Sequence, residues 1–321
     1  FNVKGNAAAE SLSNANITFP DVSPTLFSVD IPLWQFSLAG MDFSLGGFEL
    51  ALRWYALAYI AGILLASWIM RRALRRPALW PQDRPAFSEA NLDDLITWLI
   101  FGIIIGGRLG YVLFYNPSYY LANPAAALRI FDGGMSFHGG FLGVVAAGLL
   151  FCRKHKIALL KASDVMAASA PAGLLFGRLA NFINAELWGR ETTLPWGVIF
   201  PGEDAQTCVQ AAAGLCARHP SQLYEALGEG LILGALLLYL LFRTGALRRS
   251  GLLTGIFLIG YGLTRFMVEW VRQPDAQFQT LDNPIGYALQ LGPTGLTMGQ
   301  ILTLPMLLAG LWLIQKARAR P

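Results

Sequence analysis

The chain has 321 residues, of which 55% are hydrophobic and only 14% are charged, whereas about 25% of the residues in a typical soluble domain are charged. This composition excludes an ordinary water-soluble domain and predicts an all-α integral membrane protein. The net charge of +4 comes from basic clusters at the ends of apolar segments. It therefore gives no reason to expect a nucleic acid partner.

The N-terminal segment 1–48 starts with Asn, Ala and Ser and then mixes aromatic residues with Gly and Pro. We expect it to form an arm outside the membrane. The sequence leaves open whether its first residues belong to the native chain. Several of its side chains are of the type that favours the interface between lipid and water: Leu33, Trp34, Phe36, Met41 and Phe43.

Seven segments of the remaining chain, 49–321, are apolar enough to cross a membrane as helices of about 20 residues. The third is short, and the apolar run 135–137 extends it when it is included. We predict one seven-helix catalytic domain, with an outside loop domain at 184–221 between spans 4 and 5. The spans are 49–70, 92–114, 138–152, 163–183, 222–242, 252–271 and 297–315.

Clusters of Lys and Arg follow spans 1, 3, 5 and 7. Because cationic flanks stay in the cytoplasm, we expect the N-terminus outside and the C-terminus inside. Cys208 and Cys216 then share the outside loop, where a disulfide forms only if that side is oxidising; the sequence leaves this open. The cationic clusters contain Arg71, Arg72, Arg75, Arg76 and Arg84; Arg153, Lys154, Lys156 and Lys161; Arg243, Arg248 and Arg249; and Lys316, Arg318 and Arg320.

In this topology the polar residues of the spans fall near their outer ends. An Arg costs about 2.5 kcal/mol or more at the centre of a membrane helix, so such residues usually have a functional partner. Arg178 and Asn181 share a helix face, as do Arg265 and Glu269, because residues three or four apart lie on one side of a helix. The residues that we expect around one cavity are Arg53, Tyr55, Arg108, Tyr111, Tyr115, His138, Arg178, Asn181, Asn184, Glu186, Arg265 and Glu269.

These charged residues allow two interpretations, a structural role within the protein and the binding of an anionic ligand. Arg265 with Glu269 is a natural structural pair, and His138 fits a packing histidine at a helix end. However, the sequence offers few acids to balance the arginines, and the planar guanidinium group suits phosphate. We therefore expect an anionic ligand. Small residues around Arg108 and His138 predict close helix packing: Gly106, Gly107, Gly110, Gly133, Gly134, Gly139 and Gly140.

The sequence predicts neither a metal site nor a cofactor. It contains only three histidines, His138, His155 and His219, and no CxxC motif, so a site built from Cys and His is poorly supported. No nucleotide-binding motif is present.

The segment 177–189, GRLANFINAELWG, resembles the signature GRxGNFxNxExxG of the prolipoprotein diacylglyceryl transferases. Ala180 and Ala185 stand where Gly is common in that family, and Arg53 stands where His is expected. Further similar stretches are GGRLGYVLFYN at 106–116, DGGMSFHGG at 132–140, RHPSQLYE at 218–225, YGLTRFMVEWVRQPDAQF at 261–278 and MGQILTLPM at 298–306.

This resemblance implies a bacterial inner-membrane enzyme that acts at the outer leaflet in the first step of lipoprotein maturation. Such an enzyme transfers the diacylglyceryl group of phosphatidylglycerol to the lipobox cysteine of a preprolipoprotein and releases glycerol phosphate. The substrate thiol has to become a thiolate, and His138 is the candidate base. Arg178 and Arg265 are expected to stabilise the leaving phosphate. The expected lipid-binding residues are Tyr55, Arg108, Tyr115, Arg178, Asn181, Asn184, Glu186, Gly189 and Glu269.

The sequence argues against two other functional classes, a lipid transporter and a structural or chaperone-like membrane protein. A transporter or flippase for an anionic lipid would also use an arginine-lined cavity, but transporters commonly contain inverted repeats and midplane sites, and neither is evident here. A structural or chaperone-like membrane protein would not need such a dense polar motif. Oligomeric state, acyl-chain preference, the order of substrate binding and the identity of the base stay open.

Overall fold

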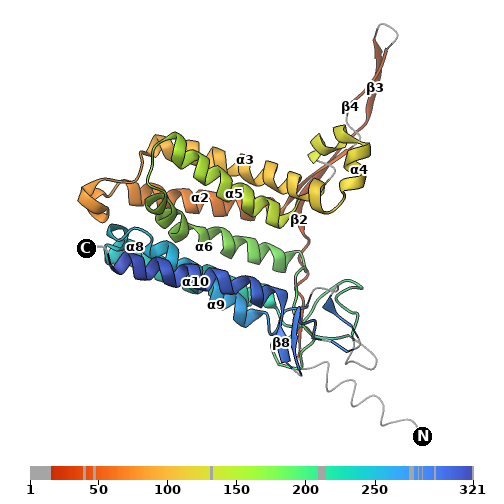
Figure 1. Cartoon of the computed structure of the whole chain (residues 1–321). Helices are drawn as coiled ribbons and strands as arrows, with labels where there is room; N and C mark the ends of the chain where they lie inside the picture. The colour runs from red at the N-terminus through yellow and green to blue at the C-terminus, as the bar shows by residue number, and fades with distance from the viewer. Residues whose placement is uncertain are drawn as a thin grey trace. The chain divides into compact units, whose positions relative to one another are not determined.

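The computed structural model describes residues 16–38, 41–45, 48–130, 133–208, 215–274, 278–280, 282–283, 285–292 and 294–319. Most of this chain is helical (Figure 1). It forms two compact units. The first unit contains Phe1–Ala66, Ala170–Leu236 and Ile256–Trp312, and the second contains Ser67–Ser169, Leu237–Gly255 and Leu313–Pro321.

Each of the seven predicted spans contains a helix, and five of these helices are long and apolar enough to cross a membrane. The five are α2 (Trp54–Leu74), α3 (Glu89–Phe114), α6 (Leu159–Ile183), the continuous helix Ser221–Arg243 and α10 (Met298–Arg318). In the continuous helix, α7 (Ser221–Glu225) and α8 (Leu233–Arg243) flank a π-helical stretch, Ala226–Ile232. The other two helices are α5 (Phe137–Lys154) and α9 (Leu252–Val268). The short helix α4 (Pro117–Ala122) follows α3.

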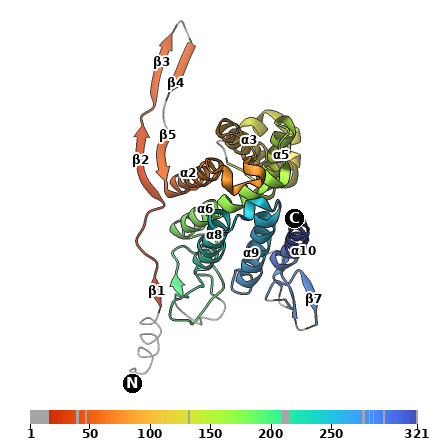
Figure 2. The same cartoon turned by 90° about the vertical axis from the view of Figure 1, so that its left-hand side faces the viewer.

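The described part of the arm forms strands, and the first helix starts later than the predicted span. Residues 49–53 belong to β5 (Phe48–Arg53), which pairs antiparallel with β2 (Thr25–Ile31). β3 (Trp34–Leu38) and β4 (Met41–Leu45) continue this hairpin (Figure 2). The reason is that β-branched and aromatic residues alternate with polar ones in these segments, which favours strands. Leu33 and Trp34 are exposed, whereas the side chains of Phe36, Met41 and Phe43 lie outside those that the structure describes.

Two shorter strand pairs were also missing from the all-α prediction. β1 (Ile17–Thr18) runs parallel to β6 (Val198–Ile199), and β7 (Leu289–Leu291) pairs antiparallel with β8 (Thr294–Leu296). Cys208 and Cys216 form a disulfide in the loop that follows β6, which answers the question that the sequence left open. Beside it Val198, Phe200 and Ala205 form a small apolar core.

Glycines let α3 and α5 approach closely in the second unit, where the two helices run side by side (Figure 1). A Cβ atom on Gly110 would lie 2.7 Å from the Cα of Gly139, and one on Gly106 would lie 2.8 Å from the Cα of Gly143. The close packing predicted for Gly106, Gly110 and Gly139 is therefore confirmed.

We predict that Gly143→Ala destabilises the protein whereas Gly148→Ala does not. Both glycines lie in α5, so each substitution gains the same helix propensity. A Cβ at Gly143 would collide with the backbone of Gly102, whereas one at Gly148 meets no atom within 4 Å. Overpacking of this kind costs about 1–3 kcal/mol. Thermal unfolding in detergent should show a lower Tm for Gly143→Ala only, and equal Tm values for the two variants would contradict the proposed close packing.

Helix α6 packs closely against two helices in the first unit. A Cβ on Gly230 would lie 2.7 Å from the Cα of Leu175, and one on Gly62 of α2 would lie 3.0 Å from the Cα of Gly173. Gly230 belongs to the π-helical stretch Ala226–Ile232. This contact brings Glu229 of that stretch, and Glu225 just before it, beside the end of α6, where Arg178 lies.

Candidate active site

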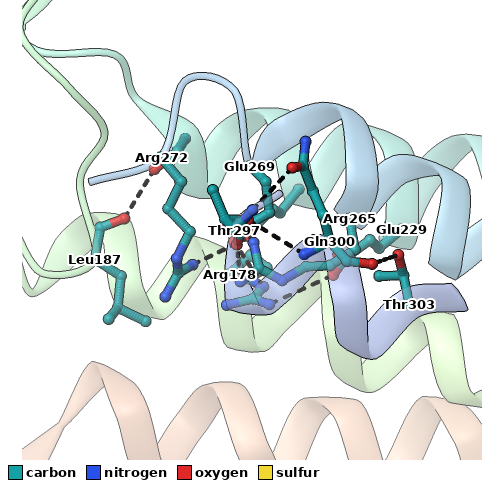
Figure 3. Close-up of polar contacts among 11 residues, drawn as sticks. Arg178, Leu187, Glu229, Arg265, Glu269, Arg272, Thr297, Gln300 and Thr303 are labelled. Atoms are coloured by element: carbon teal, nitrogen blue, oxygen red, sulfur yellow. Dashed lines mark hydrogen bonds and ion pairs between the residues drawn. The ribbon is translucent and has the colours of Figure 1, made fainter. Parts of the chain in front are cut away.

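Six charged side chains form an ion-pair cluster inside the first unit (Figure 3). They come from α6, from the continuous helix Ser221–Arg243, and from α9 with the turn that follows it. The cluster consists of Arg178, Glu225, Glu229, Arg265, Glu269 and Arg272.

Glu225 is the centre of this cluster and is fully buried. Its Oε2 lies 3.1 Å from Nε of Arg178, and its Oε1 lies 3.4 Å from Nη1 of Arg265 and 3.2 Å from Nη1 of Arg272. Glu229, one helical turn further on, has its Oε2 3.5 Å from Nη2 of Arg178. A buried charge is tolerated only when it is paired, and here each guanidinium group contacts at least one carboxylate.

Glu269 is held from both sides. It forms an ion pair with Arg265 four residues earlier, which agrees with the structural pair that the sequence offered as the alternative to a ligand site. It also accepts a hydrogen bond of 2.7 Å from the hydroxyl of Thr297. The Thr297 backbone N–H donates to Oε1 of Gln300 at 3.1 Å. Figure 3 shows these residues of the α10 N-terminus beside Glu269. The start of α10 thus fixes the orientation of one carboxylate of the cluster.

Three predicted site residues form one hydrogen-bonded chain. The amide nitrogen of Asn181 donates to the hydroxyl of Tyr55 at 3.0 Å and to a carboxylate oxygen of Glu186 at 2.7 Å. Asn181 is only 5% exposed. The sequence placed these residues together only by their depth in the membrane, and the structure brings them into direct contact.

The backbone reverses sharply after α6. Ala185 and Leu187 have φ values of +53° and +58°, a region that costs a non-glycine residue roughly 1–2 kcal/mol. A glycine would adopt this conformation without that cost. The turn buries Oδ1 of Asn184, which has no hydrogen-bond partner among the described residues. An uncompensated buried acceptor of this kind is rare.

Gly189 ends the signature where three chain segments meet. Its N–H donates to the carbonyl of His219 at 2.8 Å, and it bridges to Arg272. Arg218 donates to the carbonyl of Gly189 and lies 4.1 Å from the ring centre of Trp188. Burial lowers the pKa of the His219 imidazole, so the ring is neutral at pH 7 beside the hydroxyl of Tyr224, 3.1 Å away.

We predict that Gly189→Ala lowers the activity of the protein by at least about tenfold, or 1.4 kcal/mol in activation free energy. The added Cβ would collide with the carbonyl of Val271 and lie 2.7 Å from the Cβ of His219, which displaces Arg272 beside it. The measurement is the initial rate of the purified protein in detergent.

The matched control for this prediction is Gly177→Ala, at the other end of the signature, where a Cβ meets no atom within 4 Å. It should retain the wild-type rate and should not lower the Tm, because Ala has the higher helix propensity. A Gly189→Ala variant with wild-type rate and wild-type Tm would refute a positioning role for this junction.

Arg53 is exposed at the end of β5 in the first unit. The other predicted residues belong to the second unit. His138 is exposed in the first turn of α5, which begins after Ser136, whose Oγ accepts from the N–H of Gly139. Tyr115 follows α3 and stacks on Tyr111 with ring centres 5.4 Å apart. His138 and Tyr115 are thus both exposed, His138 in the first turn of α5 and Tyr115 directly after α3.

Arg108 has surroundings that differ from those expected of a lipid ligand. The side chain is 5% exposed. All three of its nitrogen atoms donate to backbone carbonyls between residues 126 and 134, and these bonds use its five N–H donors. The acceptors are the carbonyls of Ala126, Ala127, Arg129, Gly133 and Gly134. Arg108 therefore holds the segment that leads to His138, and no N–H is left for a phosphate.

The expectation that the arginines outnumber nearby acids is wrong. Glu225 and Glu229 were overlooked although both lie inside a predicted span, where a charge normally indicates function. The available signal was their spacing of four residues, together with the position of Glu225 as the last residue of RHPSQLYE. Arg272, Thr297 and Gln300 were missed because they lie at helix ends, where polar residues are common. Among the described residues no three His, Cys, Asp or Glu side chains gather as metal ligands.

These features define a helical protein with membrane-length apolar helices and a buried cluster of arginines and glutamates at the end of its signature helix. The profile of the family "Prolipoprotein diacylglyceryl transferase" matches residues 42–316. The chain belongs to this family.

Similar proteins match nearly the whole chain. A protein of Ruegeria pomeroyi is 58% identical over 307 residues, which cover 96% of this chain and 99% of the relative. Relatives from Roseobacter denitrificans and Cereibacter sphaeroides are each 56% identical and cover 95% and 94% of this chain and 98% of each relative. All three are named phosphatidylglycerol–prolipoprotein diacylglyceryl transferase.

Proposed function

We propose that this protein transfers the diacylglyceryl group of phosphatidylglycerol to the lipobox cysteine thiol of preprolipoproteins. The observation that carries the proposal is the placement of the family signature: its Arg178 lies in a buried cluster with Arg265 and Arg272. The full-length similarity to enzymes of that name supports it.

The reaction is a displacement at a glyceryl carbon. The substrate sulfur forms a bond to this carbon, the bond from the carbon to the phosphate oxygen breaks, and glycerol phosphate leaves. The thiol proton has to go to a base, because the thiolate is the nucleophile. We assign this role to His138, whose ring is exposed at the start of α5.

Negative charge grows on the leaving phosphate, and preorganised cations in a dry site stabilise it most. Arg178 and Arg265 have this role, since their side chains are only 17% and 18% exposed. The unpartnered Oδ1 of Asn184 would gain a donor from a glycerol hydroxyl. Asn181, Glu186 and Tyr55 hold this end of α6 in shape, and Glu269 orients Arg265 within the same unit. A contribution of Tyr115 to lipid binding stays a prediction from the sequence.

The protein in this proposal crosses the bacterial inner membrane seven times, with the N-terminus outside. Two observations support this orientation: basic residues follow alternate spans, and the disulfide Cys208–Cys216 suits an oxidising outside loop. Arg178, Gly189 and Arg265 lie at the helix ends that face this loop. The active site then opens to the outer leaflet.

We predict that Arg178→Ala and Arg265→Ala each lower the rate by about 10²-fold or more, the usual cost of losing one preorganised group that stabilises transition-state charge. His138→Ala should lose activity similarly if its ring is the base. Purified protein in detergent is mixed with phosphatidylglycerol and a lipobox peptide, and both the lipidated peptide and glycerol phosphate are measured. Thermal unfolding reports whether each variant is folded.

Arg153→Ala is the matched control, because Arg153 is exposed in the last turn of α5. It should retain wild-type rate. The proposal would be overturned if well-folded wild-type protein formed no lipidated peptide. That result would favour the alternative function, transport of an anionic lipid. Full activity of His138→Ala would assign the base elsewhere while leaving the transferase proposal in place.

A further inference from the structure

The ion-pair cluster already contains as many carboxylates as guanidinium groups. Arg178, Arg265 and Arg272 face Glu225, Glu229 and Glu269. A phosphate that enters this cluster therefore meets arginines whose donors are directed at internal anions. For a phosphate to bind, at least one of the three carboxylates has to lose contacts with the arginines.

The three carboxylates are held differently. Glu269 accepts from Thr297 and pairs with Arg265, and a Cβ on Gly299 would lie 2.9 Å from its Cγ, so it is packed in place. Glu229 contacts Arg178 at 3.5 Å. Of the carboxylates that the structure describes, only Glu225 contacts three guanidinium groups.

The contacts of Glu225 are numerous and long. They measure 3.1, 3.4 and 3.2 Å, whereas a strong charge-assisted hydrogen bond measures about 2.7–2.9 Å. One carboxylate has two oxygens to share among three guanidinium groups, and a phosphate has three or more. The geometry therefore favours exchange of long contacts to Glu225 for shorter ones to a phosphate.

We infer that Glu225 is an internal anion that competes with the phosphate of substrate and product for Arg178, Arg265 and Arg272. This inference rests on the proposed function and deepens it. Glu225 keeps the arginines apart, charged and oriented while the site is empty. It also limits how tightly the site holds glycerol phosphate, so that this product can leave.

The substitution Glu225→Gln tests this competition, because it removes the negative charge of the side chain and keeps its shape. In Glu225→Gln the cluster has one uncompensated positive charge, in a place where water does not screen it. The variant should bind glycerol phosphate about tenfold or more tightly. The reason is that the Glu225 carboxylate, which repels the phosphate and competes for the same arginines, is lost from a site of low dielectric. The KM for phosphatidylglycerol and kcat should both fall, since product release slows. A purely structural role would instead raise KM or weaken binding.

The direct measurement is calorimetric binding of glycerol phosphate, with glycerol as the uncharged control ligand, to detergent-purified wild type and Glu225→Gln. Glu203→Gln is the control variant, because Glu203 is an exposed acid in the outside loop and should bind as wild type. Unchanged or weaker glycerol phosphate binding by folded Glu225→Gln would overturn the inference.

If Glu225→Gln does not fold, Glu225→Asp replaces it. The shorter side chain keeps the charge but lengthens the contacts, so it should also bind glycerol phosphate more tightly, and weaker or equal binding would again contradict the inference. The binding assay needs no turnover. Tighter binding without any transferase activity in wild type would uphold the role of Glu225 while the proposed function fails.

Discussion

The structure of the first unit depends on the pairing of buried charges between apolar helices. An arginine or glutamate alone at this depth would be expensive, and mutual attraction offsets that cost only when the geometry is good. Glu225 compensates for the length of its individual contacts by their number, because it contacts three guanidinium groups at once. Helix α6, the helix Ser221–Arg243 and the end of α9 are therefore joined by electrostatics as well as by apolar packing.

Small residues make this pairing possible. Because Gly230 lets the π-helical stretch approach Leu175 of α6 closely, Glu225 and Glu229 come within reach of Arg178. Glycines also allow close helix packing in the second unit, where Gly106 and Gly139 let α3 and α5 approach each other. There Arg108 turns its donors to backbone carbonyls and shapes the segment before His138. Two arginines of apolar helices thus have different roles, since Arg178 faces carboxylates and Arg108 faces a peptide backbone.

Much of this could be predicted from the sequence. The positions of the helices followed from runs of apolar residues, and the pair Arg265–Glu269 followed from helical spacing. The chain from Tyr55 through Asn181 to Glu186 was anticipated as a group but not as a set of hydrogen bonds. The strand pair β2–β5 was missed, because a search for long apolar runs merges a short strand such as Phe48–Arg53 with the helix that follows it.

The sequence by itself determined that this is a helical membrane protein of the prolipoprotein diacylglyceryl transferase family, because apolar length and a long polar signature are properties of contiguous residues. Only the tertiary structure decided the partners of each charge. Glu225 lies 47 residues from Arg178 and 47 from Arg272 in the chain, and no local pattern links them. Their contact arises from helix packing, which decides whether an arginine is neutralised by an internal carboxylate or directed at the backbone.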